Sequence, residues 1–269
     1  MEIPVYHKAI ATNPLAAGLD ATIYGTIKQG LSSPGRSSGL FMGRQIMHIF
    51  RSVAAHQSPP DFIRGLIPEL SEEETFLLLR EGMDIAKSLA RPDRGGAASN
   101  WDCAIVYAVA RAMNPDEIIE TGTGVGATSV MALEGTRDNH SMVLTTFDRE
   151  DEGSGEDGVP YYRWKELPLS GVGQLIPEYY GEKVVFVLGD IKETLPRWIS
   201  GNATPVDPGH KRLVILDSLH TPEHQVFEVE QLSRILSSGS IILCDDTTYG
   251  WAESVGTYDN CGFLGGIVI

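Results

Sequence analysis

The chain has 269 residues, enough for one α/β domain with an extension and for a large hydrophobic core. Its 36 acidic residues outnumber its 21 basic ones, and the formal net charge of −15 disfavours binding to nucleic acid or to anionic membrane surfaces. The three cysteines form no disulfide framework and no metal-binding pattern. Residues 1–5 lack the features of a secretory signal, and no apolar run is long enough to span a membrane. We therefore expect a cytoplasmic protein.

The N-terminal part of the chain predicts loops and helices rather than strands. Residues 40–55 have the pattern of a helix, and we expect the Ser58-Pro59-Pro60 sequence to end it. Residues 71–74 form a capping box ahead of an apolar stripe, which predicts a helix that runs to about Ala90. We expect residues 1–98 to be an N-terminal arm with helices, a candidate lid or oligomerisation element.

An α/β domain is expected over residues 99–269. It begins with a helix at 101–113, capped by Ser99 or Asn100. After it, short apolar strands alternate with helices, which predicts a doubly wound, mostly parallel, Rossmann-like sheet with right-handed crossovers. The strands are expected at residues 117–121, 142–147, 184–188, 213–216 and 240–244. The helices are expected at residues 128–135, 169–179, 191–199 and 222–236.

A glycine-rich turn follows the first strand, in the sequence Glu120-Thr121-Gly122-Thr123-Gly124-Val125-Gly126-Ala127. A buried strand, a tight turn and the start of a helix together form the unit that holds a nucleotide-like ligand. Glycine suits such a turn because a side chain would keep the backbone from the ligand, and because the turn often requires a positive φ.

Acidic residues follow each of the next four strands: Asp148, Asp190, Asp217 and Asp245. The carboxyl ends of parallel strands meet at one edge of a sheet, where ligands bind in open α/β folds. Folding does not require four acids at that edge, so they predict a site. Asp190 also fits a simple helix cap, and Asp148, about 20 residues beyond the glycines, suits two ribose hydroxyls.

The glycine turn alone is ambiguous. Gly122, Gly124 and Ala127 fit the dinucleotide-binding pattern, whereas Gly122, Gly124 and Gly126 fit a tighter pattern with a glycine at every second position. A nicotinamide enzyme would also need a substrate domain with a proton relay. Only residues 247–269 remain after the last acidic pair, which argues against a nicotinamide enzyme.

The ordered motifs resemble those of class I S-adenosylmethionine-dependent methyltransferases over residues 101–248. The resemblance implies that the turn and the strand ends bind the cofactor. Asp148 corresponds to the ribose-binding acid, and Gly189-Asp190 to the segment beside the adenine. The cofactor-binding residues implied in this way are Glu120, Thr121, Gly122, Thr123, Gly124, Gly126, Asp148, Gly189, Asp190, Asp217 and Ser218.

A narrower likeness lies in Asp217-Ser218-Leu219-His220 and in the later Asp245-Asp246 pair. These segments are similar to the cephalosporin-hydroxylase-type group and the macrolide-sugar O-methyltransferases, and more distantly to catechol O-methyltransferases. The likeness implies that Asp217, Asp245 and Asp246 hold Mg²⁺, with Asp217 and His220 as catalytic residues and His220 as the base. His224, which follows in the next helix, is expected to pack or to lie at the surface.

Physical reasoning supports such a metal site. Three carboxylates at neighbouring strand ends would repel one another unless a cation joined them, and oxygen ligands suit a hard ion such as Mg²⁺. A bound Mg²⁺ lowers the pKa of a substrate hydroxyl, and a histidine near neutrality can accept its proton.

One departure from class I methyltransferases concerns the C-terminus. These enzymes usually add two antiparallel strands after the fifth, whereas residues 263–269 can supply one strand at most. An uncovered sheet edge invites association, so we expect a homo-oligomer. The leading hypothesis is an Mg²⁺-dependent O-methyltransferase acting on a small hydroxylated acceptor, such as a natural product or a sugar. The alternatives are an NAD(P)-dependent oxidoreductase and a cofactor-binding protein without methyl transfer.

Overall fold

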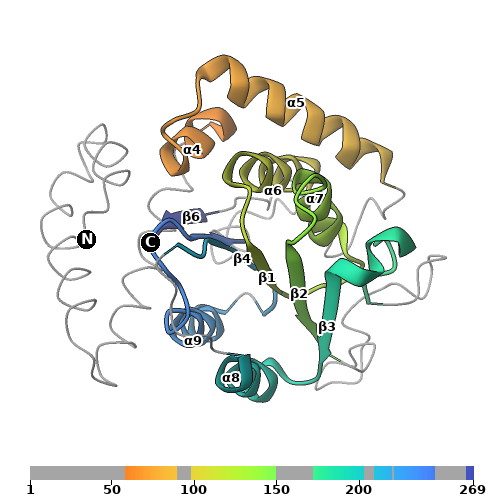
Figure 1. The fold of residues 1–269 in the computed structure, drawn as a ribbon, viewed down its shortest axis with the longest axis vertical. Coiled ribbons are helices and arrows are strands. Elements are labelled where there is room, and N and C mark those ends of the chain that lie inside the picture. The colour runs from red at the N-terminus through yellow and green to blue at the C-terminus, as the bar shows by residue number, and fades with distance from the viewer. Residues whose placement is uncertain (1–57, 90–97, 150–171, 203–208, 220, 246–264) are drawn as a thin grey trace, which may run out of the picture.

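A computed structural model describes residues 58–89, 98–149, 172–202, 209–219, 221–245 and 265–269 (Figure 1). These residues contain one six-stranded sheet with the strand order β3-β2-β1-β4-β5-β6. The strands are β1 (Glu117–Thr121), β2 (Val143–Asp148), β3 (Val184–Leu188), β4 (Arg212–Leu216), β5 (Ile241–Cys244) and β6 (Gly265–Val268). β1 to β5 are parallel and β6 is antiparallel to β5, which confirms the mostly parallel sheet and the single strand expected near the C-terminus.

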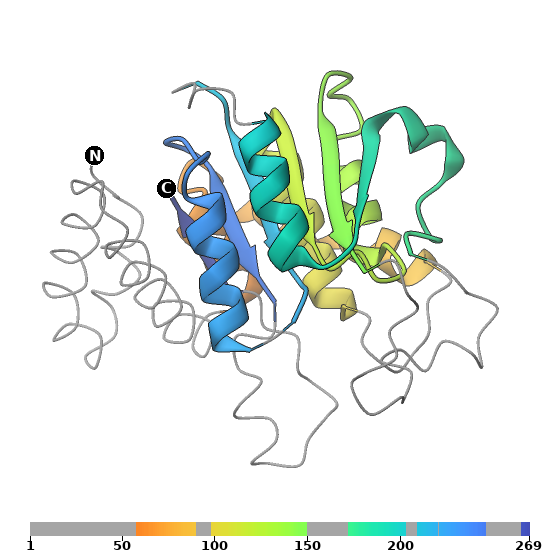
Figure 2. The ribbon, with the colours of Figure 1, turned by 90° about the horizontal axis from the view of Figure 1, so that it is seen from below.

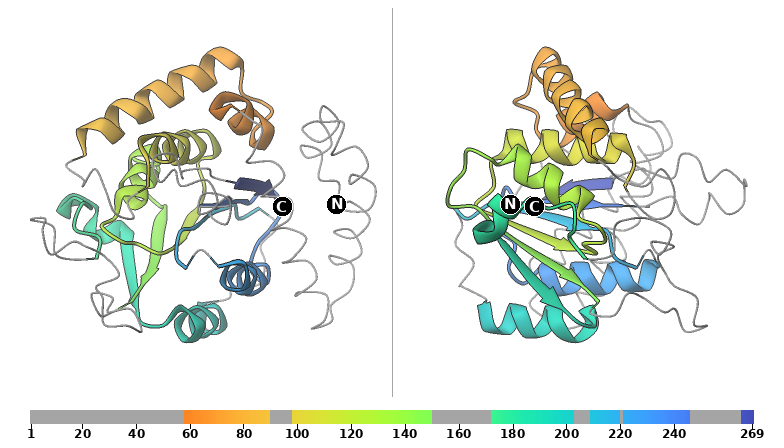
Figure 3. Two further views of the ribbon diagram at one scale, coloured as in Figure 1. Left: turned by 180° about the vertical axis from the view of Figure 1, so that it is seen from behind. Right: turned by 90° about the vertical axis from the view of Figure 1, so that its right-hand side faces the viewer.

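Helices cover both faces of the sheet. They are α4 (Pro59–Leu66), α5 (Glu72–Ser88), α6 (Asn100–Met113), α7 (Ala127–Gly135), α8 (Ile191–Asn202) and α9 (Pro222–Leu232), with a 3₁₀ helix, η2 (Glu178–Lys183). α6 and α7 lie on one face and α8 and α9 on the other, while α5 lies outside α6 (Figures 1 and 3). No helix in the described parts of the chain has the length and apolar character needed to cross a bilayer.

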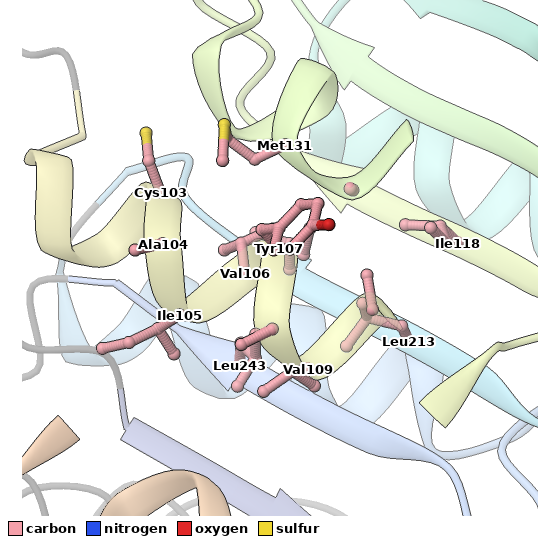
Figure 4. Packing of buried hydrophobic residues seen from close by; sticks show 14 of the residues in the cluster. Cys103, Ala104, Ile105, Val106, Tyr107, Val109, Ile118, Met131, Leu213 and Leu243 are labelled. Atoms are coloured by element: carbon pink, nitrogen blue, oxygen red, sulfur yellow. The ribbon is translucent and has the colours of Figure 1, made fainter. Parts of the chain in front are cut away.

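The central strands are buried on both sides, as their continuous apolar runs predict for a parallel sheet. Along β4, Leu213 and Ile215 join the cluster beneath α6 and α7, whereas Val214 and Leu216 join the cluster beneath α8 and α9. Successive strand side chains point to opposite faces, so one short strand supplies both clusters. Figure 4 shows Leu213 of β4 and Val109 of α6 among the side chains of the first cluster.

The helices before the α/β domain share its core. Buried side chains of α4 and α5, among them Ile63 and Leu79, belong to the same cluster as α6. Gly82 of α5 faces Ala104 so closely that an added Cβ would lie 2.9 Å from the Ala104 backbone. The predicted capping box at Ser71 is present in α5, and Ser99 caps α6. The expectation that residues 1–98 form a separate arm, as a lid or an oligomerisation element, stays a prediction.

Three local predictions differ from the structure. Ser58-Pro59-Pro60 was expected to end a helix, but Ser58 caps α4 and the prolines occupy its first positions, where a missing N–H costs nothing. The α-helix expected at 169–179 is absent from its described part, residues 172–179, where a turn with Gly173 at φ 70° leads into η2. α9 ends at Leu232 instead of continuing to 236. The helix expected at 40–55 lies outside the described residues.

Candidate functional site

Strand register brings the ends of the five parallel strands to one edge of the sheet, which lies lowest in Figure 2. Thr121 at the end of β1 is paired with Phe147 of β2 on one side and with Leu216 of β4 on the other. Leu216 is in turn paired with Cys244 of β5. The residues that follow these positions include the expected binding residues. They therefore leave the sheet at the same level.

The turn Gly122–Gly126, called the glycine turn below, is fixed to both neighbouring strands. The Gly122 N–H donates to the Phe147 carbonyl of β2 at 2.8 Å, and the Asp217 N–H after β4 donates to the Thr121 carbonyl at 2.8 Å. The turn itself closes through a hydrogen bond from the Gly126 N–H to the Thr123 carbonyl. It leads into α7, so backbone N–H groups at a helix start lie beside it, as an anionic or polar ligand requires.

The glycines of the turn serve different purposes. Gly122 has φ 86°, and a Cβ added there would lie 1.9 Å from the Asp217 carbonyl oxygen, so this glycine is needed for packing against the end of β4. Gly124 has φ 51°, and an added Cβ would meet no atom of the described residues within 4 Å. The backbone at Gly124 is thus open to a ligand, the role that the sequence assigned to all three glycines.

A turn from the segment before β3 lies against the glycine turn. The Gly173 N–H donates to the Gly124 carbonyl and the Leu175 N–H to the Val125 carbonyl, both at 2.9 Å. A Cβ on Gly126 would approach Ile176 Cγ1 to 2.9 Å. The third glycine therefore allows residues 173–176 to pack on the turn, a contact that the sequence did not indicate.

Asp148, at the end of β2, supports the turn directly. Its Oδ2 accepts a hydrogen bond from the Gly124 N–H at 2.7 Å, and its Oδ1 accepts one from the Arg149 N–H at 2.6 Å. Burial raises the pKa of Asp148, and these backbone hydrogen bonds oppose the rise. Each carboxylate oxygen has a second lone pair, so the side chain retains the capacity to accept ribose hydroxyls.

The carboxylate of Glu120 is fully buried beneath the turn and is held by hydroxyl groups of the chain. Its Oε1 accepts from Thr128 at 2.7 Å, and its Oε2 accepts from Ser129 at 2.5 Å and from Thr146 at 2.6 Å. Thr146 is in turn 2.6 Å from the hydroxyl of Thr123 in the glycine turn. Burial raises the pKa of Glu120, while the hydroxyl hydrogen bonds act in the opposite direction.

Glu120 was expected to bind the cofactor, and that expectation stays a prediction. In the structure the Glu120 carboxylate joins β1, β2 and the first turn of α7 from within the protein. The Thr121 hydroxyl is buried as well. The side chains of these two residues support the glycine turn from within, while Gly124 and Asp148 are the described residues that the turn presents to a ligand.

The β3 end supplies a cap. The Gly189 N–H donates to the Asp148 carbonyl at 2.8 Å, and Asp190 Oδ1 accepts from the Lys192 N–H at 2.8 Å at the start of α8. The capping role that the sequence left open for Asp190 is therefore present. It leaves the expected contact of Gly189 and Asp190 with an adenine as a prediction.

The β4 and β5 ends carry the expected metal ligands. Asp217 and Asp245 follow the paired residues Leu216 and Cys244, and the Asp245 N–H donates to the Leu216 carbonyl at 2.9 Å. The third expected ligand, Asp246, and the expected base, His220, lie outside the described residues. Among the residues that are described, no group of three or more His, Cys, Asp or Glu side chains is arranged to hold a metal.

A buried polar cluster behind these two strand ends was not predicted. Ser218, expected to bind cofactor, donates its hydroxyl proton to Glu228 Oε1 at 2.6 Å, and His224 Nε2 lies 3.4 Å from the same oxygen. Gln225 Nε2 donates to the Asp245 carbonyl at 3.1 Å. The spacing of residues 224, 225 and 228 along one helix face was the available signal, because it places three polar side chains towards the sheet.

Comparison with known proteins agrees with this arrangement. A family model described as a methyltransferase domain matches residues 119–247, from β1 to just beyond β5. The match spans just under half of the chain, and over these residues the chain is similar to a methyltransferase domain. The predicted enzyme class, an S-adenosylmethionine-dependent methyltransferase, is confirmed, and it takes the place of the nicotinamide alternative. No curated protein matches the chain.

Several solved structures have a chain path that is partly similar, and three of them are named as methyltransferases. The Podospora anserina methyltransferase PaMTH1, bound to S-adenosylhomocysteine, is 20% identical with a TM-score of 0.39, and the match covers 63% of this chain and 62% of that one. The O-methyltransferase TomG of Streptomyces achromogenes, involved in tomaymycin synthesis, is 18% identical with a TM-score of 0.39, and the match covers 69% of this chain and 72% of that one. An O-methyltransferase of Bacillus cereus is 12% identical with a TM-score of 0.42, and the match covers 72% of this chain and 91% of that one. At these values the likeness carries no argument about the acceptor.

Proposed function

We propose that the methyltransferase domain is an Mg²⁺-dependent O-methyltransferase whose acceptor is a hydroxyl group of a small molecule, such as a natural product or a sugar. The observation that carries this proposal is the placement of Asp217 and Asp245 directly after paired residues of β4 and β5, beside the glycine turn. Two carboxylate-bearing positions at one level of a sheet edge suit a hard divalent cation, which prefers oxygen ligands.

The residues of the chain take distinct roles in this proposal. The open backbone at Gly124 and the carboxylate of Asp148 hold the cofactor, which supplies the methyl group. Asp217, Asp245 and Asp246 hold Mg²⁺, which would acidify the acceptor hydroxyl. His220 accepts the hydroxyl proton, and fixed positions of acceptor and cofactor account for much of the rate. The homo-oligomer expected from an uncovered sheet edge also stays a prediction.

Substitution of the expected metal ligands tests the proposal. Asp217→Asn and Asp245→Asn keep the side-chain size and remove one negative charge each. We expect both variants to lose product formation with an acceptor panel of hydroxylated compounds. Asp245 is not among the expected cofactor-binding residues, so Asp245→Asn should also bind S-adenosylhomocysteine with wild-type affinity in calorimetric titrations. Full turnover of a folded Asp217→Asn variant would contradict the metal role and leave methyl transfer standing.

The acceptor panel also addresses the alternative of a cofactor-binding protein without methyl transfer. Conversion of S-adenosylmethionine to S-adenosylhomocysteine that depends on one of the hydroxylated compounds excludes that alternative. Tight cofactor binding with no methylation across sugars, phenols and aliphatic alcohols would instead favour it. The measurement is the acceptor-dependent release of S-adenosylhomocysteine.

A further inference from the structure

The first two turns of α9 connect the two strand ends that carry Asp217 and Asp245. Gln225 reaches the β5 end by donating to the Asp245 carbonyl at 3.1 Å. Glu228 reaches the β4 end by accepting the Ser218 hydroxyl at 2.6 Å. One rigid helix therefore holds both strand ends through separate hydrogen bonds.

This polar cluster is buried. Glu228 is 0% exposed, Gln225 is 4% exposed and His224 is 6% exposed. Within the described parts of the chain, Glu228 Oε2 and His224 Nδ1 have no hydrogen-bond partner. Burial of a carboxyl group and an imidazole costs folding free energy that apolar side chains at the same positions would not.

The rest of α9 packs against the sheet through apolar side chains, among them Val226 and Val229. Within the described residues, the hydrogen bonds of the Gln225 and Glu228 side chains go instead to Asp245 and Ser218, which follow β5 and β4, where the proposed metal ligands lie. Hydrogen-bonded partners behind the ligands of a metal site fix their orientation and tune the affinity for the ion.

We infer that Gln225 and Glu228 are positioning residues that set the separation of Asp217 and Asp245, with His224 as the buried partner of Glu228. The inference rests on the proposed metal-dependent function. Glu228 acts through Ser218, whose neighbour is Asp217, and Gln225 acts through the backbone of Asp245 itself. Neither side chain is required to touch the cofactor or the acceptor.

The test compares two glutamines on the same helix. Gln225→Leu removes the donor to Asp245, and Gln231→Leu is the matched control in the last turn of α9. Mn²⁺ binding to the full-length protein is measured by electron paramagnetic resonance, and S-adenosylhomocysteine binding by calorimetry. We expect Gln225→Leu to weaken Mn²⁺ binding about 10- to 100-fold with unchanged S-adenosylhomocysteine affinity, and Gln231→Leu to match the wild type in both.

A second variant guards against misfolding. Ser218→Ala removes only the hydroxyl that Glu228 accepts, and we expect it to weaken Mn²⁺ binding in the same direction. Wild-type Mn²⁺ affinity in folded Gln225→Leu and Ser218→Ala overturns the inference and leaves the proposed function intact. Equal losses of Mn²⁺ and S-adenosylhomocysteine binding show general damage to the edge and also overturn it. Absence of Mn²⁺ binding to the wild type contradicts the metal-dependent function itself.

Discussion

Alanine substitution at Gly124 and at Gly122 separates a ligand-facing glycine from a packing glycine. At Gly124 the added Cβ meets no atom within 4 Å in the parts of the chain that the structure describes, so the cost to folding is mainly that of an L residue at φ 51°, about 1 kcal/mol. At Gly122 the Cβ would lie 1.9 Å from the Asp217 carbonyl oxygen, so the backbone must move and the cost rises to several kcal/mol.

The two variants should therefore fail in different assays. We expect Gly124→Ala to lower the thermal midpoint by about 2–4 °C and to weaken S-adenosylhomocysteine binding by about 10-fold or more, because the methyl group occupies the space left for the ligand. Gly122→Ala should lower the midpoint much further. Gly181→Ala, at another open glycine without a positive φ, is the control for both assays. A Gly124→Ala variant with wild-type affinity would refute the placement of the cofactor against this turn.

Three further predictions follow from the same residues. Because burial raises the pKa of Asp148, S-adenosylhomocysteine affinity should fall as the pH is lowered through that pKa, and Asp148→Asn should bind weakly with a flatter pH profile in calorimetry. The pKa of Glu120 is also raised above its usual 4.5, so the folded state retains a proton that the unfolded chain releases, and stability from this group falls as the pH rises from 4.5 to the raised value. In urea unfolding, Glu120→Gln should lose less stability than the wild type over that interval, and a parallel pH profile for both would contradict the assignment. Ser71→Ala should cost about 1 kcal/mol by removing the cap of α5, with S-adenosylhomocysteine affinity unchanged as the check that the site is intact.

The strands and the row of acids were predictable because their signals are local. β1 and β3 have the bounds expected from their apolar runs. The parallel direction of the strands follows from the alternation of strands and helices along the chain. Once the strands are parallel, their ends must lie at one edge, so Asp148, Asp217 and Asp245 come to the same side of the sheet.

Contacts between distant segments were not predictable in the same way. The glycine turn looks uniform in sequence, yet Gly122 packs against the β4 end and Gly126 against Ile176, whereas a Cβ on Gly124 would meet none of the described residues. The direction of Glu120 depends on hydroxyls of α7 and β2 that come later in the chain. Ser58-Pro59-Pro60 was misinterpreted because proline at the first helical positions and proline after a helix end look alike in sequence.

Magnesium dependence of turnover tests the central proposal most directly. The measurement is acceptor-dependent release of S-adenosylhomocysteine by the wild-type protein, first in excess EDTA and then after Mg²⁺ is restored. With oxygen ligands expected from Asp217, Asp245 and Asp246, turnover should stop in EDTA and return with Mg²⁺, while S-adenosylhomocysteine binding persists throughout. Equal turnover in EDTA and in Mg²⁺ would contradict a metal-dependent O-methyltransferase.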